Sequence, residues 1–407
     1  MHQVMRGTRV LEVASWTFVP AAGAVLADWG ADVLKIEHPE TGDPQRGLMT
    51  MGIMPGGGAG VDFMMEFPNR GKRSVAIDIA TDDGRELLYR LAEVSDVFLT
   101  NFLPHTRRNL RIDVDDIRAR NPRIVYVRGH GQGHRGPEAG RGGYDGASYW
   151  SRGAVGDTLT PPGSEWPVGL RPAFGDVMGG LTIAGGISAA LYAREKTGEP
   201  PVVDVSLLGT AMWQIQPDIV ISRVLGMDDV MRFGDRKGSA NPLVGTYRTK
   251  DDRYIFLNMM QSDRYFPDLA RRMGHPELIE DARFANAAAR AEHRVEFIEC
   301  FDGIFGSKTL AEWRDALAES EGVWAPVQRA PELYDDPQVE ANGYLRPVTD
   351  GHGNDFQLVA APVQFDETPP DLRSAPQHGE HTDDVLRELL GLDDETIINH
   401  KVSGAIL

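Results

Sequence analysis

The stretch TRVLEVA at residues 8–14, followed by PAAGAVLADWG at 20–30 and ADVLKIE at 31–37, decides the fold. The first and third stretches are short and rich in aliphatic residues, as expected of buried strands. The middle stretch predicts a helix, because Pro20 suits a first helical turn and Gly30 suits the residue after the last turn. A strand, a helix and a second strand in this order predict a parallel pair in an α/β sheet.

The same alternation continues outward from this unit through roughly the first 200 residues. We expect further strands at 74–79, 97–99 and 124–127 and helices at 82–94 and 114–120. This order is typical of a doubly wound domain, in which ligands bind at the loops after the strands. The most apolar segment, 177–193, contains four glycines. It is shorter than the roughly 20 apolar residues that a membrane helix needs, and we expect a buried helix there.

The pattern changes after about residue 225. A hairpin within 238–260 and helices at 263–274, 290–305 and 308–320 predict a smaller α+β unit. In the tail we expect short strands at 339, 347–348 and 357–363. Helices at 382–391 and 393–398 follow, the first with Thr382 as its N-cap.

The composition excludes several classes of protein. The 407 residues carry 42 Lys and Arg against 60 Asp and Glu, a formal net charge of −18. Nucleic-acid and anionic-membrane binders are usually basic, so we expect neither partner. A single cysteine, Cys300, excludes an internal disulfide and a multi-cysteine metal site. No signal peptide is visible at the N-terminus, and we expect a cytoplasmic protein.

The usual nucleotide-binding motifs are absent from the sequence. The turn after the first strand contains bulky residues, from Ser15 to Pro20, where a dinucleotide-binding fold has glycines. Two histidines, His130 and His134, lie in a glycine-rich loop with no clear carboxylate as a third ligand. We interpret that loop as shaping a pocket and predict no metal site.

Asp176 stands out because it lies between glycines at the start of the apolar segment. One interpretation is a helix N-cap, since Asp is a preferred capping residue. The other is a nucleophile that attacks a carbonyl carbon, with the backbone N–H groups of Gly175, Gly179 and Gly180 stabilising the oxyanion. The spacing alone leaves both open.

Several basic residues lie in or beside loops after predicted strands, where a doubly wound sheet binds its ligand. A local group of cations on an acidic protein would suit a phosphorylated ligand, although solvated surface charges would give the same pattern. These residues are Arg46, Lys72, Arg73, Arg107 and Arg108.

A series of short motifs, in order over nearly the whole chain, resembles family III CoA-transferases, the CaiB/BaiF superfamily. That superfamily includes formyl-CoA and carnitine CoA-transferases and α-methylacyl-CoA racemases. The matching stretches are RVLE at 9–12, GADVLKIE at 30–37, TGDP at 41–44, NRGKRS at 69–74, NFLP at 101–104, NPRIVY at 121–126, GQG at 131–133, GDVMGG at 175–180, DPQV at 336–339 and GEHT at 379–382.

The resemblance implies the fold and the assembly. We expect a large Rossmann-like, doubly wound α/β domain built from both chain ends, 1–224 and 331–407, plus a smaller α+β domain over 225–330. Members of the family form interlocked homodimers, and we expect the same here.

The resemblance also implies the reaction. The aspartate of the Gly-Asp motif is the catalytic residue of the family and falls on Asp176. In the transferases it attacks an acyl-CoA thioester to give a mixed anhydride, and thiolate then converts the anhydride to an aspartyl-CoA thioester. A carboxylic acid acceptor takes over the CoA. We expect CoA thioesters as substrates and no permanently bound cofactor.

The racemases of the superfamily pair this aspartate with a histidine, which is replaced here by Tyr144. A tyrosine, with a pKa near 10, is a poor base at neutral pH, which favours a transferase over a racemase or isomerase. A non-catalytic CoA-binding homologue is the third interpretation, and the presence of Asp176 disfavours it.

The resemblance further assigns binding residues. For CoA these are His38, Lys72, Arg73, Asn101, Phe102 and Arg108, with Arg107 as the neighbour that could replace Arg108 and Arg141 as a weaker candidate. For the substrate pocket they are Thr17, Phe18, Tyr144, Asp145, Gly179 and Gly180. An apolar acyl pocket could also be lined by Trp16, Phe18, Trp150 and Met178, or these could be ordinary core residues.

Overall fold

The computed structural model describes residues 3–49, 51–52, 60–226 and 236–407. The chain divides into two compact units. The larger comprises Met1–Thr158, Val168–Arg223 and Pro337–Leu407, and the smaller comprises Leu159–Pro167 and Val224–Asp336. The expected divisions at 224/225 and 330/331 fall within a few residues of these, and only the short segment Leu159–Pro167 was not foreseen.

The larger unit contains a six-stranded parallel sheet in the order β3-β2-β1-β4-β5-β6. The order reverses between β1 and β4, so the loops after these two strands diverge and leave room for a ligand at the carboxyl edge. The strands are β1 (Arg9–Val13), β2 (Asp32–Glu37), β3 (Arg73–Ala76), β4 (Val97–Thr100), β5 (Val125–His130) and β6 (Val202–Ser206).

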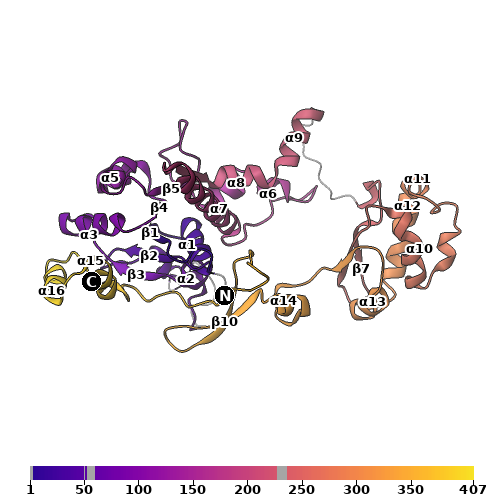
Figure 1. Ribbon diagram of the computed structural model, residues 1–407. Helices are drawn as coiled ribbons and strands as arrows, with labels where there is room; N and C mark the ends of the chain where they lie inside the picture. Colours follow the sequence, from indigo (N-terminus) through magenta and orange to yellow (C-terminus); the bar gives the residue numbers. More distant parts are fainter. Residues whose placement is uncertain (1–2, 50, 53–59, 227–235) are drawn as a thin grey trace. The chain divides into compact units, whose positions relative to one another are not determined.

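Helices cover both faces of this sheet, with α3 and α5 on one side and α1 and α7 on the other (Figure 1). Successive strand residues alternate between the two layers, so Val10 packs toward α1 while Leu11 packs toward α3. The helices before residue 226 are α1 (Phe18–Asp28), α2 (Phe63–Asn69), α3 (Asp82–Glu93), α4 (Pro104–Leu110), α5 (Val114–Arg120), α6 (Val155–Thr158), α7 (Phe174–Thr197), α8 (Leu207–Gln214) and α9 (Gln216–Leu225).

Helix α7 is long and apolar enough to cross a membrane by length and composition, a test that core helices of soluble proteins also pass. Here it packs against α1 through glycines. A Cβ on Gly179 would lie 2.3 Å from the Phe18 ring, and one on Gly180 would lie 2.6 Å from the Ala21 side chain. The two helices can approach this closely only because both positions lack a side chain.

The C-terminal segment returns to the larger unit. Residues 337–407 contain α14 (Pro337–Ala341), the antiparallel pair β10 (Leu345–Thr349) and β11 (Asp355–Val359), α15 (Thr382–Leu390) and α16 (Asp394–Val402). This segment covers the free edge of β3, where the backbone N–H of Ala76 donates to the Thr382 hydroxyl over 3.0 Å.

Two predictions in this segment are wrong. Val339 lies in α14 rather than in a strand. Thr382 is the first residue of α15, and its hydroxyl accepts from the Ala76 N–H of β3, so it does not cap the helix. His381 occupies the N-cap position.

The smaller unit is an α+β structure, as its sequence pattern predicts. Its sheet, in the order β7-β8-β9, is antiparallel, and its core is built largely from aromatic rings on α10, α12 and α13. The predicted helix 290–305 is interrupted at His293. The elements are β7 (Val244–Arg248), β8 (Tyr254–Asn258), α10 (Ser262–Met273), α11 (Ala287–Glu292), α12 (Arg294–Phe305), α13 (Leu310–Leu317) and β9 (Trp324–Pro326).

Candidate active site

A cavity of about 300 Å³ opens at the carboxyl edge of the parallel sheet in the larger unit. Its walls come from the loops after β1, β4 and β5 and from the first turn of α7. Five residues predicted from the sequence line it together, namely Phe18, Asn101, Phe102, Tyr144 and Asp176. Trp16, His130 and Arg141, which were only weaker candidates in the sequence analysis, also line it.

Asp176 is the third residue of α7 and contributes a carboxylate to the cavity. Among the described residues, none donates a hydrogen bond to this carboxylate. Burial, and then the negative charge of Asp145, raise the pKa of Asp176 to about 7. A carboxylate without a donor or a cation is poorly stabilised and therefore more basic and more nucleophilic than an ordinary surface aspartate.

Asp145 fixes the start of α7 from outside the helix. It begins a π-helical turn over Asp145–Ser151, and both of its carboxylate oxygens accept from the Gly175 N–H at 3.1 Å. Ala173, in the left-handed conformation, occupies the N-cap position of α7. Asp176 is therefore not the N-cap, and that alternative from the sequence is wrong. Asp145 itself does not line the cavity and supports α7 from behind.

The predicted role of the glycines needs correction. Gly179 and Gly180 pack against α1 and do not line the cavity. The Gly175 N–H is already bonded to Asp145, and the Val177 N–H to the Ala173 carbonyl oxygen. These amides are thus not free to hold an oxyanion over Asp176.

The loop between β1 and α1 is held by several side chains. The Asn101 amide bonds both backbone groups of Ser15, accepting from its N–H at 3.2 Å and donating to its carbonyl at 2.6 Å. Thr17 is buried, and its hydroxyl accepts from the Gln45 side chain at 3.1 Å. Thr17 consequently does not reach the predicted pocket, while Asn101 both lines the cavity and shapes its neighbour.

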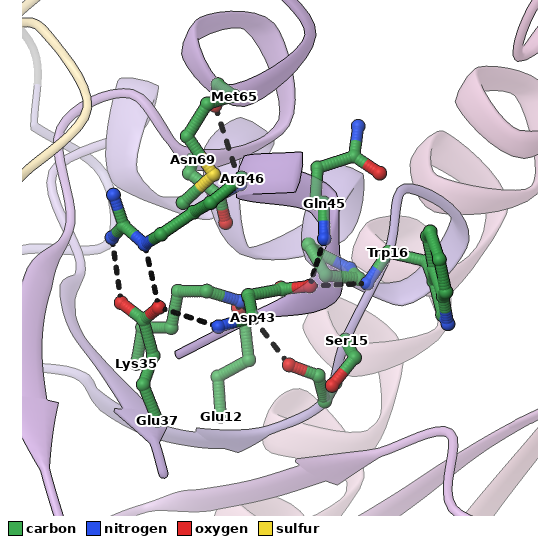
Figure 2. A network of polar contacts seen from close by, with 12 residues as sticks. Glu12, Ser15, Trp16, Lys35, Glu37, Asp43, Gln45, Arg46, Met65 and Asn69 are labelled. Atoms are coloured by element: carbon green, nitrogen blue, oxygen red, sulfur yellow. Dashed lines mark hydrogen bonds and ion pairs between the residues drawn. The ribbon is translucent and has the colours of Figure 1, made fainter. Parts of the chain in front are cut away.

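Next to this loop lies a group of paired charges that we call the buried network (Figure 2). Lys35 bonds the carboxylate of Asp43 at 2.7 Å, and Arg46 bonds that of Glu37 at 2.7 Å. Although burial alone would raise it, Arg46 and Lys35 lower the pKa of Glu37 to about 2. The network comprises Glu12, Lys35, Glu37, Asp43, Arg46 and Lys72.

The positions of Lys72 and Arg73 revise their predicted contact with CoA phosphates. The Lys72 side chain is fully buried, and its Nζ donates to both oxygens of Glu12 at 2.7 and 2.8 Å. Arg73 lies at the amino edge of the sheet, opposite to the cavity, where it pairs with Asp32 at 2.6 Å and with Glu388 at 2.8 Å. Neither cation reaches the cavity.

His38, Arg107 and Arg108 also lie outside the cavity lining. His38 is exposed after β2, and its carbonyl oxygen bonds His378. Arg107 is buried and donates to the Phe102 carbonyl oxygen at 2.7 Å, whereas Arg108 is exposed. Arg107 is thus a structural residue, and of the two arginines only Arg108 is available to a ligand.

Two further lining residues carry polar groups, namely Gln132, which had no predicted role, and Arg141, which was only a weaker candidate for binding CoA. Gln132 donates through Nε2 to Ser148 at 2.9 Å, while its buried Oε1 has no hydrogen-bond partner. Arg141 is the arginine among the lining residues, with a side chain 72% exposed and 3.3 Å from Glu138. Both follow β5, and their place after a parallel strand was the signal that could have identified them.

His130, His134 and Asp204 form a group whose ligand atoms lie within 4.8 Å of one another. The Arg128 guanidinium, however, already bonds both oxygens of Asp204 at 2.8 and 3.0 Å. Burial would raise the pKa of Asp204, but the bonds from His130 and Arg128 lower it. Arg128 and His130 neutralise the Asp204 carboxylate. The arrangement therefore fits an ion pair beside the cavity better than a metal site.

Comparison with known proteins gives a consistent result along the whole chain. The model of "CoA-transferase family III" matches residues 5–382. An (R)-2-hydroxy-4-methylpentanoate CoA-transferase of Clostridioides difficile is 31% identical over 99% of both chains. A succinate–glutarate CoA-transferase of Agrobacterium fabrum is 31% identical over 95% of both. A cinnamoyl-CoA:phenyllactate CoA-transferase of Clostridium sporogenes is 28% identical over 94% of this chain and 92% of its own.

Solved structures show the same fold. A CaiB/BaiF family protein from Brucella suis has a TM-score of 0.79 and 28% identity, covering 96% of this chain and 100% of its own. A protein from Mycobacterium tuberculosis has a TM-score of 0.78 and 25% identity over 96% and 99% of the two chains. The mixed α/β architecture with a six-stranded parallel sheet is common to these relatives.

Proposed function

The chain belongs to CoA-transferase family III and is a transferase enzyme, and we propose that Asp176 is the nucleophile through which it moves CoA from an acyl-CoA to a carboxylic acid. The observation that carries this proposal is the Asp176 carboxylate itself, which lines the cavity with no donor or cation from the described part of the chain bound to it. Such a group is reactive near neutral pH, as a nucleophile toward a thioester must be.

The proposed steps follow from the chemistry of a carboxylate. An Asp176 oxygen attacks the thioester carbon, the C–S bond breaks, and CoA departs as thiolate. The product is a mixed anhydride of Asp176 and the donor acid. Thiolate then attacks the Asp176 carbonyl carbon and releases the donor acid as carboxylate, which leaves an aspartyl-CoA thioester. The acceptor carboxylate attacks the carbonyl carbon of this thioester, the C–S bond breaks, and CoA departs as thiolate, so that a second anhydride joins Asp176 and the acceptor. Thiolate finally attacks the acceptor's acyl carbon and regenerates Asp176.

The walls of the cavity support assignments for the two ends of the substrate. Trp16, Phe18 and Phe102 supply aromatic surface for an apolar acyl group. Arg141, exposed at the cavity, would bind an anionic part of CoA, with Asn101 and Arg108 contributing along the same edge. CoA enters and leaves as a substrate, and no permanently bound cofactor is required by these steps.

The acceptor that we favour is a 2-hydroxy carboxylic acid. Two relatives are named for acids of this class, (R)-2-hydroxy-4-methylpentanoate and phenyllactate, and a third is named for glutarate. These three acids form a suitable first panel of acceptors.

We also propose that the enzyme is a cytoplasmic homodimer, as the family resemblance implies. Large apolar side chains remain exposed on three consecutive helices of the larger unit. A second copy of the chain would cover them. They are Phe174, Val177, Met178 and Tyr192 on α7, Met212 and Trp213 on α8, and Ile219 and Val220 on α9.

One experiment tests the proposed mechanism. The protein is incubated with a panel of acyl-CoAs, trapped with hydroxylamine, and digested for mass spectrometry of the peptide that contains Asp176. We expect a hydroxamate at Asp176, and CoA exchange that disappears in Asp176→Asn. Exchange of substrate α-protons with deuterated water, without any modification of Asp176, would instead support a racemase or isomerase. Binding of CoA with neither signal would support a non-catalytic homologue.

A further inference from the structure

The loop Ala14–Thr17 between β1 and α1 contains a strained residue that faces the candidate active site. Trp16 has a φ of 68°, in the left-handed region that bulky residues rarely adopt. Such a conformation is strained and persists only where the surroundings fix it.

Every residue of this loop is held by a side chain from elsewhere in the larger unit. Lys35 donates to the Ala14 carbonyl oxygen at 3.1 Å. The Trp16 N–H donates to an Asp43 oxygen at 3.0 Å. Ser15 and Thr17 are held by Asn101 and Gln45, as described above. The backbone of the loop thus has little freedom to relax.

Asp43 is the part of this arrangement that bonds Trp16 directly. One of its oxygens accepts from the Trp16 N–H and, at 2.9 Å, from the Gln45 N–H, while the other pairs with Lys35 at 2.7 Å. Asp43 is 2% exposed and Lys35 is fully buried. A buried pair of this kind resists displacement, because moving either partner leaves an uncompensated charge.

The Trp16 ring points away from the buried network (Figure 2). It lines the same cavity as Asp176 and meets the Tyr144 ring edge to face, with the centroids 5.8 Å apart. Two aromatic rings from different loops therefore close one side of the space in which an acyl group would lie.

We propose that Trp16 limits the size of the acyl group next to Asp176, and that Asp43, paired with Lys35, is the positioning residue that sets the place of this wall. This proposal rests on one part of the proposed function, namely that the cavity binds the acyl group of an acyl-CoA. Its physical basis is the direct bond from Asp43 to the strained Trp16 backbone, which links the buried network to the shape of the cavity.

The test measures selectivity for size with two non-reactive thioethers, S-ethyl-CoA and S-benzyl-CoA, by titration calorimetry. We expect Trp16→Gly to change the affinity ratio in favour of the benzyl compound by about tenfold or more, because it removes the wall. Glycine also tolerates the φ of this position without strain. Asp43→Ala should change the ratio in the same direction, by roughly three- to tenfold.

The double variant distinguishes positioning from general destabilisation. If Asp43 acts through Trp16, then Asp43→Ala in the Trp16→Gly background should leave the ratio within about twofold of Trp16→Gly alone. Asp32→Ala is the matched control, because Asp32 lies on the same strand as Lys35 and pairs with Arg9 and Arg73 at the amino edge, away from the cavity. It should lower stability without changing the ratio.

An unchanged ratio in Trp16→Gly, or additive effects in the double variant, would overturn the proposal. So would the absence of binding of either thioether to the wild-type protein, which would also contradict acyl-CoA as the substrate. A changed ratio without any acylation of Asp176 would uphold the role of Trp16 while contradicting the transfer mechanism. The two proposals can therefore fail separately.

Discussion

Two groups of carboxylates in the larger unit have opposite surroundings. In the buried network, Glu37 and Asp43 are bound by Arg46 and Lys35, and the pKa of Glu37 falls to about 2 despite its burial. At the cavity, Asp176 has no basic partner among the described residues, and its pKa rises to about 7. The difference shows how one residue type serves two purposes. Glu37 and Asp43, which are paired with cations, hold the fold, and Asp176, which has no such partner, is left reactive.

The largest effect should come from replacing Asp176, the reactive carboxylate. Asp176→Asn should lower CoA exchange by at least about 10³-fold, because it removes the nucleophile. Its unfolding midpoint in urea at pH 8 should stay at or above that of the wild type, since no ion pair is lost. An equally inactive variant whose midpoint fell sharply would place Asp176 with the structural carboxylates.

The second effect concerns the carboxylates of the buried network, which are paired with cations. Lys35→Met should destabilise the protein by about 3–5 kcal/mol, because it leaves the buried charge of Asp43 without its cation, whereas Glu12 keeps Lys72. Urea unfolding at pH 7 measures the change in the free energy of unfolding. Lys401→Met provides the control, because Lys401 pairs with Asp383 at a half-exposed site and should cost less than about 1 kcal/mol.

The third effect concerns pH. Acylation of Asp176 needs the carboxylate form, so its rate should rise with pH and reach half its maximum near pH 7. Asp145→Asn removes the neighbouring negative charge yet keeps an oxygen that accepts from the Gly175 N–H. The pH at which the acylation rate reaches half its maximum should then fall by about one unit. Rates of hydroxamate formation measure this change.

The same pKa has a consequence for stability. Because the folded protein holds the Asp176 proton more tightly than the unfolded chain, this residue favours folding at low pH, and that contribution is lost as the pH rises from about 4 to about 7. The stability difference between Asp176→Asn and the wild type should therefore grow across this window. A constant difference between pH 4 and pH 8 would contradict the raised pKa.

The smallest effect separates cations that reach the cavity from those that do not. Arg141→Ala should raise the KM for acyl-CoA by about three- to tenfold, as for an exposed charge that binds an anion. Arg73→Gln, at the amino edge of the sheet, should change it by less than about twofold. Steady-state kinetics with one acyl-CoA is sufficient. The reverse ranking would restore the role that the sequence motif gave to Arg73.

Local signals predicted most of the fold. The strands β1 to β5 and the helices α1, α3 and α5 lie close to their predicted bounds, because each depends on its own periodicity and end signals. The short helices α2 and α4 were not predicted. The strand β6 was missed, since Val202–Ser206 is a short, half-exposed edge strand that contains Asp204. The break at His293 was missed because the helical pattern continues through it.

The candidate site was predictable only in part. Asp176 was found from its flanking glycines, and Asn101 and Tyr144 from the family resemblance. The role of Lys72 was not, because its partner Glu12 lies 60 residues away in the sequence. The same holds for Asp145, which bonds Gly175 across 30 residues. Long-range pairing of charges decides between a ligand contact and a structural contact, and no local pattern contains that information.

The covering of β3 by the C-terminal segment has a consequence for synthesis on the ribosome. Ala76 and its partner Thr382 are 306 residues apart. At translation rates of about 5–20 residues per second, the edge of β3 stays without this partner for roughly 15–60 s. An uncovered edge of a parallel sheet can pair with other chains during that time. The nascent chain should therefore depend on chaperones more than the finished protein does, and slower translation should lower its soluble yield.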